Sequence, residues 1–173
     1  MKTKLNWKKR LFSFSYSIYD NDKQIGFIKS NFFSSKSTAE LNDKKYEFKS
    51  GISIAGTNII DASNNKVIGK ISYEARRNKA FIEVNNEIFV WEYKNLWDTK
   101  WGIYDLKGLN ILYNSSAPHA YLFNCKGEIE TNGGNEIELL SGLYVNYKYK
   151  QSSKFLLLIL ALVLCGKFIK IYL

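Results

Sequence analysis

The sequence has one proline, one histidine and two cysteines among its 173 residues, and these shortages exclude several classes of protein. Cys125 and Cys165 are too few for a disulfide framework, so we expect a reducing compartment. A single histidine, His119, cannot build a histidine-rich metal site, and neither cysteine has a metal-ligand spacing. His119 with Cys125 would make a nucleophile and its base, but nothing in the sequence indicates an oxyanion hole.

Catalytic fingerprints are missing as well. The glycines form no phosphate-binding loop, and no Walker-type, nucleophile-elbow or HExxH pattern occurs. We therefore expect no enzymatic activity, no cofactor, no metal and no small-molecule substrate.

Aromatic residues and basic charge are abundant. Hydrophobic residues make up 46% and aromatic residues 16% of the chain, a composition that favours β-rich folds. The net charge of +9 attracts nucleic-acid phosphates or anionic lipid headgroups. The high content of Lys, Asn and Ile is also typical of an AT-rich genome, in which lysine is the default surface residue.

The first residues resemble the charged start of a signal peptide. Ser13, Ser15 and Ser17 interrupt the apolar run that should follow, and no small-residue cleavage site comes after them. We expect a cytoplasmic protein without a cleavable signal peptide.

Apolar and polar residues then alternate in short runs. Phe12, Phe14, Tyr16 and Ile18 alternate with serines, which indicates a half-buried β-strand. Further apolar runs separated by turn residues cover 25–33, 52–60, 67–75, 80–84, 87–93, 101–105 and 109–113. Turns at such short intervals predict an antiparallel sandwich or barrel.

A weak internal repeat indicates how many strands there are. Asp20, Asp61 and Asp105 each end an apolar run and precede a polar turn, with spacings of 41 and 44 residues. Aspartate at a turn bonds the following backbone N–H groups, which explains its place without any function. If each period holds four strands, the chain forms a closed barrel of about 12 strands.

In the last 40 residues, the strand-like alternation gives way to a helical pattern. Asn135 and Glu138 form a capping-box pattern that predicts a helix over residues 136–149. In it, Ile137, Leu140, Tyr144 and Tyr147 would share one face. Residues 143–150 also alternate as a strand would, but we favour the helix.

A second apolar segment follows from residue 154 to residue 173. Its uninterrupted run is shorter than the roughly 20 residues of a typical membrane helix, although lysines near its end could reach the headgroups. It is thus either a membrane tail or a barrel plug. The residues that define it are Phe155, Leu156, Leu157, Leu158, Ile159, Leu160, Leu162, Val163 and Leu164.

The segment from Val67 to Leu112, with Trp101-Gly-Ile-Tyr-Asp105, resembles the tubby C-terminal-like superfamily, which includes phospholipid scramblases and LURP-one-related proteins. The resemblance implies a closed 12-stranded barrel around a central hydrophobic helix, either 136–149 or 155–168. Residues 1–150 would form this barrel domain. The acidic calcium-binding stretch of scramblases has no matching pattern here, so calcium is not expected.

Basic residues near the expected hairpin tips and helix ends are candidates for lipid headgroup contact. They are Arg76, Arg77, Lys79, Lys148, Lys150 and Lys154. For Arg76 and Arg77, a solvated basic turn is favoured over lipid contact. Trp91, Trp97 and Trp101 could stack nucleic-acid bases, but their strand alternation favours packing in the barrel.

The sequence thus predicts a non-catalytic, membrane-associated β-barrel that binds anionic phospholipid or is tethered by its C-terminal segment. The alternative is a soluble module for protein or nucleic-acid interaction whose C-terminal helix plugs its own barrel. Assistance with lipid movement, as in scramblases, is a third and weaker analogy.

Overall fold

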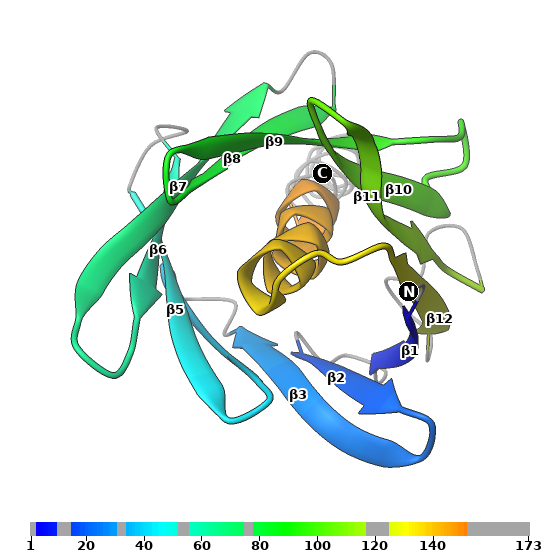
Figure 1. The fold of residues 1–173 in the computed structure, drawn as a ribbon, viewed down its shortest axis with the longest axis horizontal. Coiled ribbons are helices and arrows are strands. Elements are labelled where there is room, and N and C mark those ends of the chain that lie inside the picture. The colour runs from blue at the N-terminus through cyan, green and yellow to red at the C-terminus, as the bar shows by residue number, and fades with distance from the viewer. Residues whose placement is uncertain are drawn as a thin grey trace, which may run out of the picture.

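The computed structural model describes residues 3–9, 15–30, 34–51, 56–74, 78–116 and 125–151, which form a β-barrel around a helix (Figure 1). The helix covers residues 136–151 and is called the inner helix below. The strands are β1 (Thr3–Lys9), β2 (Ser15–Asp20), β3 (Lys23–Ser30), β4 (Lys36–Leu41), β5 (Lys44–Ser50), β6 (Thr57–Asp61), β7 (Lys66–Glu74), β8 (Lys79–Val84), β9 (Glu87–Tyr93), β10 (Lys100–Asp105), β11 (Gly108–Asn114) and β12 (Cys125–Thr131).

The twelve strands close into one antiparallel barrel. Each strand pairs with its neighbours in the chain, and β1 pairs with β12 to complete the circle. The expected fold class, a closed antiparallel barrel of about 12 strands around a C-terminal helix, is confirmed. Closure leaves the twelve described strands without a free edge at which another chain could add a strand.

The two strands that complete the circle were not foreseen. Residues 3–9 look like a charged leader, yet they form β1, in which Leu5 and Trp7 face the core. β12 carries two glutamates and a lysine, so its apolar alternation is weak.

The internal repeat is present in the structure. The strand pairing shifts register between Ile18 and Tyr19, between Ile59 and Ile60, and between Ile103 and Tyr104. Each shift lies shortly before the aspartate that ends β2, β6 or β10, and these strands are four apart in the barrel. The barrel therefore consists of three similar four-strand units.

Two of the three repeated aspartates bond backbone groups of their turns as expected, and Asp20 accepts from the Asn21 side chain. Asp61 Oδ1 accepts a hydrogen bond from the backbone N–H of Ser63 at 2.9 Å. Asp105 Oδ1 accepts bonds from the N–H groups of Lys107 and Gly108 at 2.6 and 3.0 Å. These bonds lower the pKa of both carboxyl groups.

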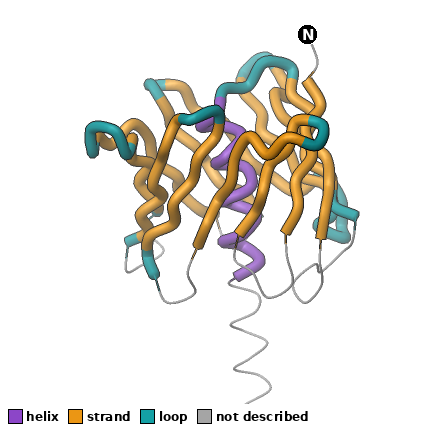
Figure 2. Tube along the Cα trace, turned by 90° about the horizontal axis from the view of Figure 1, so that it is seen from below, coloured by secondary structure: helices purple, strands orange, loops and turns teal. Residues whose placement is uncertain are grey.

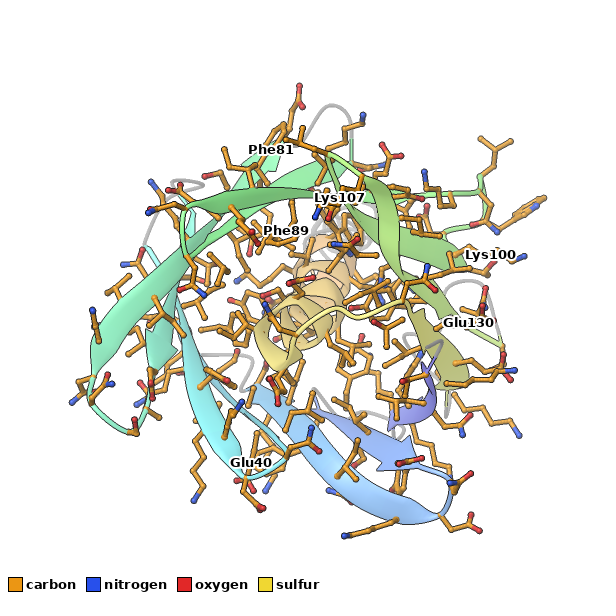
Figure 3. All side chains as sticks on the ribbon, viewed as in Figure 1. Glu40, Phe81, Phe89, Lys100, Lys107 and Glu130 are labelled. Carbon is orange, nitrogen blue, oxygen red and sulfur yellow. The ribbon has the colours of Figure 1, made fainter. Side chains whose placement is uncertain are left out.

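Side chains alternate between the inside and the outside of the barrel. Phe81 on β8 lies on the outer face, whereas Phe89 on β9 points inward and is buried (Figure 3). The core is rich in rings, and Trp101 stacks on Tyr113 with a centroid distance of 5.3 Å. The largest fully buried side chains are those of Trp7, Trp91, Trp101, Tyr113, Tyr144 and Phe48.

The inner helix runs along the barrel axis (Figure 2). Its capping box is formed: Asn135 Oδ1 accepts from the backbone N–H of Glu138 at 3.0 Å. Every residue from Leu139 to Tyr147 is buried, so burial extends beyond the face that carries Leu140, Tyr144 and Tyr147. A helix enclosed by a barrel has neighbours on all sides and buries its polar residues too.

Hydrogen bonds fasten this helix to the barrel wall. Trp91 Nε1 donates to the carbonyl oxygen of Gly142 at 3.1 Å, and the Tyr113 hydroxyl donates to that of Leu139 at 2.9 Å. Of the two segments proposed for the centre, 136–149 therefore lies there, and the segment 155–168 lies outside the described residues.

Candidate functional site

The two ends of the barrel are defined by the inner helix. At the start end, Lys44 of β5 contacts Glu136 in the first turn of the helix at 3.2 Å. At the tail end, the Tyr149 hydroxyl in the last turn donates a hydrogen bond to the backbone oxygen of Lys79, the first residue of β8. The chain continues from residue 151 at this tail end, into the segment that contains the apolar run 155–165.

Charge is distributed unequally between these ends. In the tail halves of the described strands, turns and helix, eleven lysines stand against three carboxylates, Glu74, Glu92 and Asp98. Those lysines are Lys8, Lys9, Lys29, Lys36, Lys49, Lys79, Lys94, Lys100, Lys126, Lys148 and Lys150.

The start end has the opposite balance. Six lysines there, Lys4, Lys23, Lys44, Lys45, Lys66 and Lys107, face a larger number of carboxylates. These are Asp20, Asp22, Glu40, Asp43, Asp61, Glu83, Glu87, Asp105, Glu130, Glu136 and Glu138. The barrel is therefore electrically polar along its axis, with the positive pole at the tail end.

The charges of residues that stand opposite each other on neighbouring strands also differ between the two ends. At the start end, directly opposed residues on neighbouring strands carry opposite charges, as in the pairs Asp20–Lys23, Glu40–Lys45 and Asp61–Lys66. At the tail end, Lys79 opposes Glu74 and Glu92, but lysine stands directly opposite lysine in two places, Lys8–Lys126 and Lys36–Lys49. Like charges at opposed positions destabilise a sheet.

The two lysine pairs differ in their surroundings. Lys36 Nζ lies 2.6 Å from Glu47 Oε1, whereas Glu128, which lines a hollow with Lys8 and Lys126, is paired with Lys4 at 3.1 Å. Lys8 and Lys126 are both exposed, and Lys8 Nζ lies 4.7 Å from the centre of the Tyr19 ring. We call these two residues the Lys8–Lys126 pair.

A hollow of about 850 Å³ adjoins the Lys8–Lys126 pair. Lys9 and Lys29 also line it, so four lysines surround one depression, and none of its described lining residues is a carboxylate. Hydroxyl, amide and thiol groups complete the lining, from Ser15, Ser17, Tyr19, Gln24, Ser116 and Cys125. Lysine ammonium groups and hydroxyl donors are suited to binding an anionic group such as a phosphate ester.

Three of the lysines expected to contact headgroups lie at this end. Lys79 Nζ lies 3.0 Å from Glu92 Oε2, so part of its charge is balanced within the barrel. Lys150 is buried, with its Nζ 5.8 Å from the centre of the Trp101 ring. Burial lowers the pKa of Lys148. Lys148 and Lys150 also face the negative end of the helix dipole, which is a structural reason for their presence.

The other predicted site residues are not placed by the structure. Arg76, Arg77, Lys154 and the apolar residues Phe155 to Leu164 lie outside the described residues. Their proposed roles remain predictions from the sequence.

The aromatic residues do not form one stacking platform. Trp91 and Trp101 lie inside the barrel, and the Tyr93 hydroxyl donates to Asn146 Oδ1 of the inner helix at 3.0 Å. Trp97 lies on the outside, and 68% of its surface is exposed. The arrangement therefore gives no surface on which successive bases could stack on these three tryptophans.

Sequence reasoning missed the Lys8–Lys126 pair because the two residues are far apart in the chain and meet only when β1 closes on β12. The residues at the turns and strand ends did carry a signal for the charge difference between the two ends. Those at the start end contain Asp and Asn, whereas the strand ends at the tail end repeatedly carry lysine. Since strands alternate in direction, this pattern predicts a charged pole.

Neither a metal site, nor a membrane-spanning helix, nor a similar protein assigns a function to this end of the barrel. Among the described residues, no group of three or more His, Cys, Asp or Glu side chains could hold a metal ion. No helix in the described part of the chain is long and apolar enough to cross a membrane. Comparison with known protein families, curated proteins and solved structures found no match. The resemblance to the tubby-like superfamily stays a prediction from the sequence.

Proposed function

We propose that this protein is a non-catalytic barrel that binds anionic phospholipid membranes with its tail end. The observation that carries the proposal is the like-charged register at that end, where Lys8 directly opposes Lys126 beside a hollow lined by two further lysines. An arrangement that costs stability in the free protein becomes favourable when an anionic surface lies against it.

The apolar run Phe155–Cys165 supports the same orientation. It follows the tail end in the chain, so contact of this run with lipid would bring the lysines close to the headgroups. The lysines that precede it would then lie on the cytoplasmic side, because positively charged flanks favour that side. Lipid binding and tethering are thus two parts of one mode of attachment.

The test compares the two ends of the barrel in the full-length chain. Lys8→Gln/Lys126→Gln removes two charges from the tail end, and Lys23→Gln/Lys66→Gln removes two from the start end. Binding is measured by cosedimentation with phosphatidylcholine vesicles, with and without phosphatidylserine. Circular dichroism confirms that both variants fold.

The tail-end variant is expected to bind the anionic vesicles about 30-fold more weakly, since each lysine near such a surface contributes about 1 kcal/mol. The start-end variant should bind like the unchanged protein, and salt should weaken binding. Equal weakening by both variants, or no preference for phosphatidylserine, would contradict the proposal. Failure to bind any vesicle would favour the soluble interaction module instead.

A further inference from the structure

The connection between β9 and β10 exposes two large apolar side chains next to each other. Leu96 is 98% exposed and Trp97 is 68% exposed. The other three tryptophans, Trp7, Trp91 and Trp101, are buried within the barrel. Single exposed apolar residues are common on protein surfaces, but an adjacent Leu–Trp pair at a loop tip exposes a larger apolar area.

The loop that carries this pair is held by its own polar groups. Asn95 Oδ1 accepts hydrogen bonds from the backbone N–H groups of Thr99 and Lys100, both at 3.0 Å, and Asn95 Nδ2 donates to Thr99 Oγ1 at 2.6 Å. The N–H of Lys94 donates to the carbonyl oxygen of Lys100 at 2.8 Å. These bonds fix the base of the loop and leave its tip outside the core.

The position of the loop indicates what the tip meets. It joins the end of β9 to the beginning of β10, which places it at the tail end, where lysines predominate. Lys94 and Lys100 flank it directly. Lys94 Nζ lies 2.7 Å from Glu92 Oε1, and Asp98 follows Trp97, so part of this charge is balanced locally. Tryptophan beside lysine is the combination found where proteins enter the headgroup region of a bilayer.

Leu106 provides an internal comparison. It is fully exposed in the turn between β10 and β11, at the acidic start end, where Asp105 precedes it. Lys107 follows it, but carboxylates outnumber lysines at this end, so the surroundings do not draw Leu106 to an anionic surface. It therefore serves as a matched control for Leu96.

We propose that Leu96 and Trp97 insert into the headgroup–acyl boundary of an anionic bilayer and fix the orientation of the barrel on it. The inference rests on the proposed function and adds the residues that enter the membrane. Two observations select the bilayer as the occupant: the place of the loop at the end of the barrel where lysines outnumber carboxylates, and the sequence that follows this end, which contains the apolar run Phe155–Cys165.

The burial of three tryptophans gives a direct optical test in the full-length chain. In solution, acrylamide should quench mainly the emission of Trp97. With phosphatidylcholine–phosphatidylserine vesicles, this quenching should fall, and lipids with brominated acyl chains should quench the emission instead. Both changes should disappear in Trp97→Phe, which keeps an apolar ring and lacks the reporter indole.

Binding of two aspartate variants completes the test. Leu96→Asp should weaken vesicle binding about tenfold, the effect expected for losing one inserted leucine, and Leu106→Asp should leave it unchanged. If the vesicles bind but Trp97 stays open to acrylamide, or if both aspartate variants bind alike, the insertion proposal is wrong and the lipid-binding proposal stands. If the unchanged protein binds no anionic vesicle, both proposals fail.

Discussion

Trp91 on the barrel wall and Gly142 on the inner helix approach each other closely, and the indole N–H donates to the glycine carbonyl oxygen at 3.1 Å. Tyr113 packs on the same point of the helix, because a Cβ atom on Gly142 would collide with its ring and hydroxyl. The absence of a side chain at residue 142 is therefore what lets the helix lie against β9 and β11 while both rings stay buried.

Replacing Gly142 with alanine should destabilise the fold. Alanine favours a helix by about 1 kcal/mol over glycine, but the collision with Tyr113 should cost more, as overpacked cores typically lose 1–3 kcal/mol. We expect a lower denaturant midpoint with an unchanged slope, measured by urea unfolding and intrinsic fluorescence.

Ser141→Ala is the matched control for this change. Ser141 is buried, and its Oγ has no hydrogen-bond partner within the described residues. Removing an unpartnered buried hydroxyl should leave stability equal or slightly higher. If Gly142→Ala proves as stable as Ser141→Ala, the close fit of the helix in the barrel would be disproved.

The Lys8–Lys126 pair predicts opposite effects on stability and on binding. Lys126→Glu converts an opposed pair of like charges into an attractive one, and should raise the unfolding free energy by up to about 1 kcal/mol. In a protein of this size, that corresponds to about 2–4 °C in the melting temperature. The same variant should bind anionic vesicles more weakly.

Lys66→Glu makes the same change of charge at the start end, where Lys66 opposes Asp61. It should lower the melting temperature and leave vesicle binding intact. Calorimetry and cosedimentation on both variants measure the two properties separately. Parallel losses of stability and binding in Lys126→Glu would show that this pair is merely structural.

Glu138 predicts a dependence of stability on pH. Burial, chiefly, together with the nearby Glu87 and Asp105, raises the pKa of its carboxyl group, and Oε2 has no partner within the described residues. The folded chain therefore holds this proton more tightly than the unfolded chain does. The stability that comes from this tighter proton binding is fully present below the ordinary glutamate pKa of about 4.3. It is lost as pH rises through the raised pKa of the folded chain.

Glu138→Gln tests this assignment, because glutamine cannot ionise and still suits the capping box. The variant should be more stable than the unchanged protein at pH 7, and the difference should vanish near pH 4. Thermal melts across this range measure it. A constant difference at all pH values would mean that Glu138 does not titrate in this window.

Much of the barrel could be predicted because its signals are local. The aspartates at residues 20, 61 and 105 mark equivalent turns, and Asn135 with Glu138 marks the helix start. Asp61, Asp105 and Asn135 each accept a hydrogen bond from a backbone N–H a few positions away. β1 was missed because Lys9 occupies an inward position and hides the alternation of Leu5 and Trp7.

The candidate site was harder to predict because it depends on closure. Lys8 and Lys126 become neighbours only through the pairing of the first strand with the last, and no local pattern announces that contact. Trp97 was grouped with Trp91 and Trp101, although a loop holds it apart from both. Which aromatic residues face the core depends on where a strand ends, and that boundary is the least certain part of a sequence pattern.

Lysine footprinting on vesicles would test the orientation of the barrel most directly. The full-length chain is acetylated with and without phosphatidylserine-containing vesicles, and the modified lysines are quantified by mass spectrometry. The account predicts protection of Lys8, Lys126 and Lys49 at the tail end and unchanged labelling of Lys23, Lys45 and Lys66 at the start end. Equal protection at both ends, or protection of the start end, would contradict it.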